Sequence, residues 1–197
     1  MSIVKRWIVV AAAMAALAPG LPAAEGKPKY VRTEEKYAIP DVTLVDQNGA
    51  RVRLKDYLKS DKPVLLDFIY GTCTTICPVL SAGFSNLQRK LAPDQAQVRL
   101  VSVTIDPEYD TPEVMRAYLK RYASKPGWDF FTGSRQDIDQ VMRAFKAYVP
   151  NKMSHYPVTF LLAPGGDEWV RIHGLIGTGE LMAEYRKLAQ EKGEHHE

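Results

Sequence analysis

Two runs of consecutive apolar residues in the first two thirds of the chain have the length of buried strands. Residues 63–69 and 98–105 are almost continuously apolar, which is typical of strands covered on both faces. Between them, residues 79–91 carry apolar side chains three or four positions apart, which predicts a helix with one buried face. Strand, helix and strand in this order predict a βαβ crossover in which the two strands are parallel.

The rest of the pattern predicts two hairpins and three further helices. Asn48-Gly49 separates two alternating segments, 42–45 and 51–54, and this is the strongest short-range hairpin signal. Later apolar segments and capping residues give the remaining elements, which are strands over 128–132, 157–162 and 169–173 and helices beginning after Asp110 or Thr111, after Ser134 and at Thr178. We expect one α/β domain over residues 40–190, with the first hairpin at its N-terminal end.

The first 24 residues have the pattern of an export signal. Two basic residues, Lys5 and Arg6, precede a short apolar run over 7–18 and a small-residue exit. The run has about a dozen strongly apolar residues, short of the roughly 20 that a spanning helix needs. We therefore predict a cleaved signal peptide, with an uncleaved membrane anchor as the alternative. Residues 25–39 are predicted to be an irregular linker and residues 191–197 a flexible tail.

Composition excludes some classes of partner. The 197 residues are 46% hydrophobic and 25% charged, which suffices for a substantial core. The formal net charge is +3, and removal of the two leader charges leaves 3 − 2 = +1. With so small a charge and no basic stripe interleaved with aromatics, we expect no nucleic-acid binding. Export places the protein in the periplasm, an oxidising compartment, free or anchored at the membrane surface.

The only two cysteines, Cys73 and Cys77, lie where the first core strand gives way to the helix. Pro78 suits a first helical turn, and the positive end of the helix dipole there favours thiolate over thiol. A disulfide across so short a loop would stabilise the fold very little, so we expect the sulfurs to be functional. C-x-x-x-C after a buried strand predicts a thioredoxin-like α/β domain with a central mixed sheet flanked by helices.

Two thiolates are soft ligands that suit Cu(I) or zinc, and a Cu(I) site would still need a third donor. His155 is the candidate, because its loop precedes the strand over 157–162 and is expected to pass beside the cysteines. Met153 is a weaker candidate donor, and its alternative is an ordinary loop methionine. The other histidines are expected to be ordinary strand or tail residues, namely His173, His195 and His196.

Three motifs recur in one known family. Residues 70–78 contain C-x-x-x-C-P, residues 103–112 contain D-P-x-x-D-T, and residues 155–166 place a histidine nine positions before the proline of a turn. Together they resemble the SCO/SenC family of copper-handling proteins with a thioredoxin fold, over roughly residues 40–188. The resemblance implies that copper is bound by Cys73, Cys77 and His155. Family members often carry aspartate directly before this histidine, where the present chain has Ser154.

The resemblance also implies a partner. It implies a role in building the copper site of cytochrome c oxidase, as copper donor to the copper-bearing subunit, as reductant of its thiols, or both. Because copper binding needs both thiols reduced, an oxidising compartment implies a thiol reductant as a second partner.

Residue chemistry leaves alternatives open. The same cysteines could serve a thiol–disulfide oxidoreductase that needs no metal, or, as a third option, a peroxide-reducing relative. Whether the protein is an enzyme is therefore open at this stage. Asp67, on the first core strand, is either a buried acid that tunes a thiol or a solvent-facing residue. Asp106 and Asp110 are either part of a polar site at the sheet edge or a turn aspartate and a helix cap.

Overall fold

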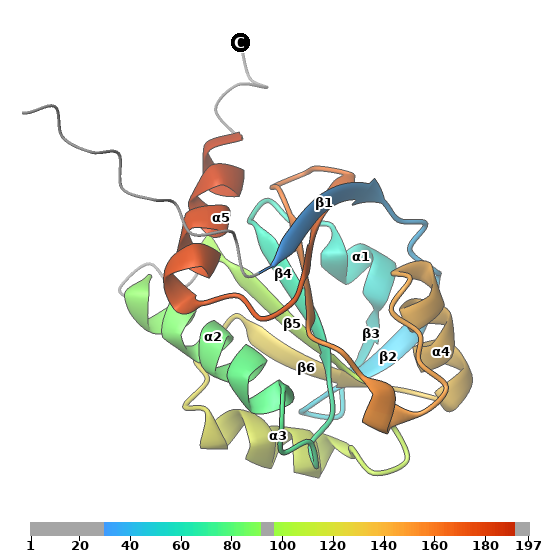
Figure 1. Ribbon diagram of the computed structural model, residues 1–197. Helices are drawn as coiled ribbons and strands as arrows, with labels where there is room; N and C mark the ends of the chain where they lie inside the picture. The colour runs from blue at the N-terminus through green and yellow to red at the C-terminus, as the bar shows by residue number, and fades with distance from the viewer. Residues whose placement is uncertain (1–29, 92–96, 192–197) are drawn as a thin grey trace, which may run out of the picture.

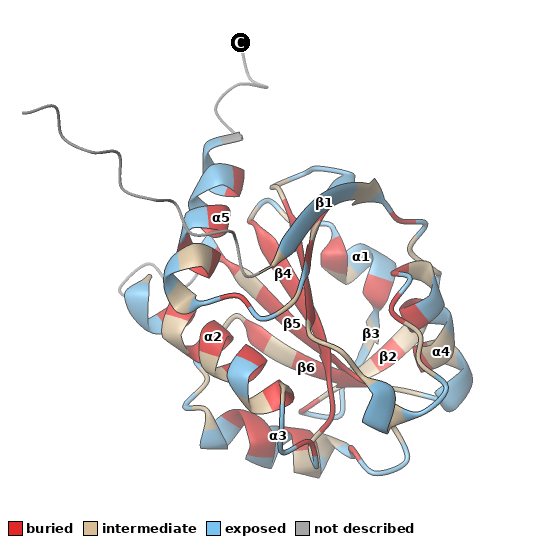
Figure 2. Cartoon of the chain, viewed as in Figure 1, coloured by how far each residue is buried: buried red, intermediate tan, exposed pale blue. Residues whose placement is uncertain are grey.

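The strand β4 (Val64–Ile69) lies inside the sheet and is buried along its whole length. It pairs in parallel with β5 (Arg99–Thr104) and antiparallel with β7 (Val158–Leu162). Figure 2 shows these central strands as the most continuously buried part of the molecule. The apolar runs in the sequence therefore form the centre of the sheet, because only strands covered on both faces can be apolar throughout.

The computed structural model describes residues 30–91 and 97–191. The predicted leader and most of the predicted tail, with His195 and His196, lie outside these ranges. The described strands form one mixed sheet in the order β1-β8-β7-β4-β5-β6-β2-β3. The strands not given above are β1 (Val31–Lys36), β2 (Thr43–Asp46), β3 (Arg51–Arg53), β6 (Trp128–Thr132) and β8 (Glu168–His173). The predicted central mixed sheet is confirmed.

Helices cover both faces of the sheet (Figure 1). They are α1 (Leu54–Leu58), α2 (Cys77–Lys90), α3 (Pro112–Arg121), α4 (Arg135–Ala144) and α5 (Thr178–Glu191). The helices α2, α3 and α5 lie together on one face, whereas α1 and α4 lie on the other. None of the helices in the described ranges is long and apolar enough to cross a membrane. This thioredoxin-like layering is the fold that the spacing of the cysteines predicts.

The βαβ prediction is confirmed, and its helix begins at a cysteine. The helix α2 starts at Cys77, with Pro78 in its first turn where a missing N–H costs nothing. On its inner side, the Ser81 hydroxyl hydrogen-bonds the Tyr118 hydroxyl of α3 at 2.7 Å. The helix α2 also contacts α5, since the side chain of Asn86 in α2 donates to the side chain of Thr178 in α5 at 3.2 Å. These contacts hold α2 against α3 and α5.

One predicted segment is wrong. Residues 31–36, which the sequence places in an irregular linker, form the edge strand β1 and pair antiparallel with β8. The segment is mostly polar and exposed, so its own pattern contains no buried face. It becomes a strand because β8 offers a free edge whose backbone groups need partners. The predicted hairpin of β2 and β3 is confirmed, and it extends the opposite side of the sheet through β6.

The buried carboxyl group of Asp67 is an exception in this apolar sheet. Asp67 lies in the middle of β4 and is fully buried, and among the described residues neither of its oxygens has a partner at hydrogen-bonding geometry. Burial raises the pKa of Asp67 to about 7, and Ser102 opposite it on β5 opposes that shift. The solvent-facing alternative for Asp67 is therefore wrong, and the carboxyl group is largely protonated in weakly acidic solution.

We expect the stability of the fold to fall as Asp67 is forced to ionise. The pKa of Asp67 is higher in the folded protein than in the unfolded chain, where it is 3.8. The stability that the protonated carboxyl group contributes is therefore complete below pH 3.8 and is lost as the pH rises through about 7. Between about pH 5 and about pH 8, wild type should lose about 3 kcal/mol of unfolding free energy relative to Asp67→Asn, which cannot ionise. Urea unfolding of both proteins at the two pH values measures this difference.

The exposed Asp56 of α1 provides the control, since Asp56→Asn should leave the pH dependence as it is in wild type. If the unfolding free energies of wild type and Asp67→Asn changed equally between the two pH values, Asp67 would be ionised in the folded protein at both, and the prediction would be wrong.

Candidate metal centre

The two cysteines are free thiols, with Cys73 in the loop between β4 and α2 and Cys77 as the first residue of α2. The Cys73 side chain retains slight exposure at 8%, whereas Cys77 is fully buried at the start of α2. The Cys77 backbone N–H donates to Cys73 Sγ at 3.5 Å, and the Thr75 hydroxyl lies 3.7 Å from the same sulfur. The two sulfurs therefore have different surroundings, with Cys73 facing hydrogen-bond donors near solvent and Cys77 facing the core.

A buried carboxylate anchors this loop. Both oxygens of Asp110 accept from the backbone N–H of Gly71 at 3.1 Å, and the Thr104 hydroxyl donates to the same group. A side chain at Gly71 would not fit, since a Cβ there would lie 2.6 Å from Asp110 Oδ1. Of the two candidate caps of α3, Asp110 and Thr111, the cap is Thr111, whose side chain accepts from the Val114 N–H, so the cap alternative for Asp110 is wrong. Asp110 instead ties the cysteine loop to the end of β5.

The strand pairing brings His155 to the cysteines. Because β7 runs antiparallel to β4, the residues just before β7 lie beside the loop that follows β4. His155 follows the short helix η2 (Lys152–Ser154), and its Nδ1 lies 3.9 Å from Cys77 Sγ. Two ligands bonded to one ion at about 2.3 Å for sulfur and about 2.0 Å for nitrogen lie about 3.5–3.9 Å apart. The observed separation therefore suits a shared ion.

The imidazole is prepared to donate a lone pair. Burial lowers the pKa of His155 to about 4, and the nearby backbone of Phe68 opposes this shift. The ring is therefore neutral at neutral pH, which is the state that binds metals. Its second nitrogen, Nε2, is buried and has no hydrogen-bond partner within bonding distance in the described ranges. A neutral ring with one nitrogen facing a thiol is the arrangement that a metal ligand needs.

The two thiols differ in acidity. Burial would raise the pKa of Cys73, but hydrogen bonds from Cys77 and Thr75 outweigh it and lower this pKa to about 7. Burial raises the pKa of Cys77 far above its usual value, and the neighbouring Cys73 and Asp67 charges add to this shift. Near neutral pH the pair therefore consists of one thiolate that is close to solvent and one protonated, buried thiol.

Two residues support the loop that carries His155, namely Tyr70, which follows β4, and Lys152, which lies in the loop itself. Tyr70 packs edge-on to His155, with ring centroids 6.3 Å apart, and its hydroxyl lies 3.9 Å from Met153 Sδ. Lys152 forms an ion pair with Asp106, which fixes the loop to the turn that follows β5. Asp106 is therefore a partner of the histidine loop. The histidine outside the site, His173, is exposed and stacks on Tyr156 at 5.0 Å.

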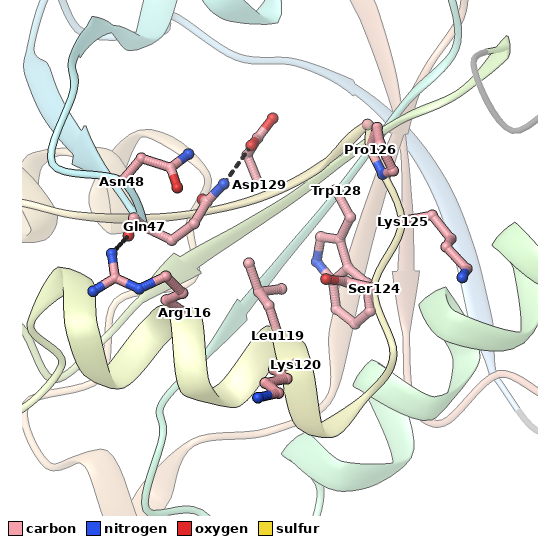
Figure 3. A pocket seen from close by; sticks show the side chains of 11 residues that line it. Gln47, Asn48, Arg116, Leu119, Lys120, Ser124, Lys125, Pro126, Trp128 and Asp129 are labelled. Atoms are coloured by element: carbon pink, nitrogen blue, oxygen red, sulfur yellow. Dashed lines mark hydrogen bonds between the residues drawn. The ribbon is translucent and has the colours of Figure 1, made fainter.

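Of two cavities in the described structure, one adjoins the candidate site and the other lies far from it. A cavity of about 470 Å³ adjoins the histidine loop and is lined by polar groups that include Asp106, Arg135 and Lys152. Another, of about 540 Å³, lies between α3 and the start of β6 (Figure 3). In this second cavity, Gln47 donates to Asp129 and Arg116 donates to the Gln47 carbonyl. It lies at the amino end of β6, and therefore at the opposite sheet edge from the cysteines.

The chemistry of the donors fits a soft metal ion. In the described part of the chain, no three His, Cys, Asp or Glu side chains lie close enough together to hold an ion without some rearrangement. Cys77 and His155 have a suitable separation, and movement of Cys73 toward them would complete a site of two sulfurs and one nitrogen. Such a donor set favours Cu(I) or Zn²⁺ over hard cations.

Comparison with known proteins gives the family. A family model described as SCO1/SenC matches residues 31–190. The SCO1 protein homolog of Bacillus subtilis is 34% identical over 158 residues, which cover 76% of this chain and 81% of the relative. The SCO2-like protein of Rickettsia felis is 32% identical over 136 residues, which cover 64% of each protein. The chain thus spans slightly less than two thirds of the length of that second relative.

Solved structures agree with this result. Bradyrhizobium japonicum ScoI with copper bound is 28% identical with a TM-score of 0.62, over 77% of this chain and 99% of that one. BsSco, a member of the Sco family of cytochrome c oxidase assembly proteins in which a disulfide switch was identified, is 29% identical. Its TM-score is 0.66, and the match covers 80% of this chain and 96% of that one. The family model extends from β1 to the last helix, and so the chain belongs to the SCO1/SenC family.

Proposed function

We propose that this protein is a copper metallochaperone that binds one Cu(I) ion through Cys73, Cys77 and His155. The observation that carries the proposal is the 3.9 Å separation between His155 Nδ1 and Cys77 Sγ, across 78 residues of sequence. The neutral imidazole and the soft sulfurs support the same conclusion. Copper in ScoI from Bradyrhizobium japonicum, a protein of similar fold, gives further support.

In this proposal copper is cargo. The Cys73 thiolate is the first sulfur available to an incoming ion, because it is the more acidic and the more exposed of the two. Cys77 must lose its proton to bind, and the bound cation offsets the cost of a buried thiolate. His155 needs no proton transfer, since burial already keeps its ring neutral. Release to a recipient proceeds by exchange of these ligands for the recipient's own thiols.

The partners and the location belong to the same proposal. We propose that the recipient is the copper-bearing subunit of cytochrome c oxidase, in line with the assembly role named for BsSco. A thiol reductant must supply the reduced cysteine pair, because a disulfide cannot bind the ion. We place the protein in the periplasm, exported by its leader and either released or anchored at the membrane.

A second function is favoured by the difference between the two thiols. A thiolate with slight exposure beside a fully buried thiol suits thiol–disulfide exchange, with Cys73 attacking and Cys77 resolving the mixed disulfide. This chemistry does not need His155. The disulfide switch identified in BsSco supports such a role beside copper binding.

Copper binding by three variants tests the first function. Reduced wild type should bind one Cu(I) ion per chain, and Cys73→Ser should lose this binding because only one thiolate remains. His155→Ala should weaken binding by about tenfold or more, which corresponds to about 1.4 kcal/mol. Competition with a Cu(I) chelator under anaerobic conditions measures these affinities.

The matched control is His173→Ala, because His173 is an exposed histidine that stacks on Tyr156 and lies outside the donor set. It should bind Cu(I) as wild type does. Wild-type affinity in His155→Ala would remove the three-ligand site and leave a two-thiolate or purely redox protein.

Alkylation kinetics test the acidity of the thiols. Iodoacetamide should modify Cys73 with a midpoint near pH 7, two units below the ordinary value of 9.0, while Cys77 stays protected in the folded protein. Thr75→Val removes one hydrogen bond to the Cys73 sulfur and should move this midpoint upward. Mass spectrometry after timed alkylation identifies the modified cysteine. Equal labelling of both cysteines, or a midpoint near 9, would contradict the predicted difference.

Turnover separates the two functions. If reduction of a disulfide substrate such as insulin is rapid and equal in wild type and His155→Ala, the oxidoreductase function is established. If it is absent while Cu(I) binding is tight, the protein acts on metal alone.

A further inference from the structure

Met153 is exposed beside the candidate metal centre, although methionine is an apolar residue. Its side chain is 75% exposed, the largest fraction among the exposed large hydrophobic residues of the described chain. The other methionines of the described ranges, Met115, Met142 and Met182, are buried in helices that face the sheet. Leaving this side chain in water forgoes the stabilisation that burial gives the others.

The backbone holds Met153 in this position. Its N–H donates to the Asn151 side chain at 2.9 Å, and the Ser154 N–H donates to the Asn151 carbonyl at 2.9 Å. The preceding residue, Lys152, is fixed by its ion pair with Asp106. The exposed side chain is therefore presented by an ordered turn, two residues before His155.

The sulfur of Met153 contacts Tyr70, a residue beside the other donors. Its Sδ lies 3.9 Å from the Tyr70 hydroxyl, and Tyr70 also interacts with the Cys73 side chain and packs against His155. One phenol therefore separates the exposed thioether from the more exposed of the two thiols. Met153 is thus a largely exposed soft sulfur, whereas the sulfurs of Cys73 and Cys77 are buried.

Thioether sulfur binds Cu(I) in preference to hard or borderline divalent cations. We propose that Met153 is the outer soft donor at which Cu(I) enters and leaves the Cys73–Cys77–His155 site. This inference rests on the proposed copper function and adds to it a third sulfur ligand, which acts transiently. Met153 would thereby favour Cu(I) over Zn²⁺ at the point of entry.

The transfer step is an exchange of ligands without electron transfer. A bond between Cu(I) and a ligand of the donor breaks as a bond to Met153 Sδ forms. The Cys73 thiolate then binds the ion, Cys77 releases its proton to water and binds, and the Met153 bond is lost as His155 binds. Copper remains Cu(I) throughout, and the one proton released is the thiol proton of Cys77.

The methyl group of Met153 provides a direct probe. We suggest labelling the reduced full chain with [methyl-13C]methionine, assigning the Met153 signal with Met153→Leu, and adding Cu(I) or Zn²⁺ without oxygen. Substoichiometric Cu(I) should shift or broaden the Met153 methyl signal, while the signals of Met115, Met142 and Met182 stay in place. Zn²⁺ bound to the same cysteines should leave the Met153 signal unchanged.

Loading kinetics provide a second measurement. Transfer of Cu(I) from its bicinchoninate complex should be slower by about tenfold in Met153→Leu, which corresponds to about 1.4 kcal/mol. Leucine keeps the size and apolar character of methionine and removes only the sulfur donor. Met182→Leu, in α5, is the matched control and should load at the wild-type rate. The equilibrium affinity of Met153→Leu should change less than the loading rate.

The outcomes separate this inference from the function on which it rests. If Cu(I) binds stoichiometrically to Cys73 and His155 while the Met153 signal and the loading rate stay unchanged, the entry role is wrong and the copper function stands. If wild type binds no Cu(I), the proposed function itself fails. Equal shifts with Cu(I) and Zn²⁺ would overturn the selective role of the thioether.

Discussion

The antiparallel pairing of β4 with β7 is the constraint on which the site depends. Because the two strands run in opposite directions, the end of β4 and the start of β7 meet at one edge of the sheet. Cys73 and Cys77 follow β4, and His155 precedes β7, so this pairing brings together donors from distant parts of the chain. A shift of β7 by one residue would turn every side chain of that strand to the opposite face. The position of the histidine is therefore specified by the same burial that stabilises the core.

The pairing of β4 with β7 brings the cysteine loop and the histidine loop together, and a few polar contacts then fix the conformation of each loop. Asp110 fixes the cysteine loop through the Gly71 N–H, and the Lys152–Asp106 ion pair fixes the histidine loop. Asp106 and Asp110 belong to one turn, in which the backbone N–H of Asp110 donates to the Asp106 carbonyl. Both donor loops are thus anchored to a single turn after β5. The geometry of the site depends on this turn as much as on the donors themselves.

The sequence predicts those parts that follow from local pattern. The apolar runs around 64–69 and 99–104 and the Asn48-Gly49 turn give strands, because burial on both faces and turn chemistry leave a local signal. The strand over 31–36 leaves none, since its structure comes from pairing with β8 far along the chain. The role of Asp110 is likewise hidden, because its partner is a backbone N–H that any residue other than proline possesses. The same limit applies to the direction in which the Met153 side chain points.

The difference between the two cysteines makes the proposed site suitable for both copper binding and disulfide chemistry. Cys73 is acidic because donors surround its sulfur, and Cys77 is weakly acidic because the core surrounds it. The thiolate nearer to solvent can attack a disulfide or capture a soft ion, and the fully buried thiol completes either reaction as resolving thiol or second ligand. What distinguishes the two outcomes is His155, which faces Cys77 and has no role in exchange. A protein that used these cysteines for exchange alone would gain nothing from burying a neutral imidazole at that distance, so the ring is the residue that favours the metal.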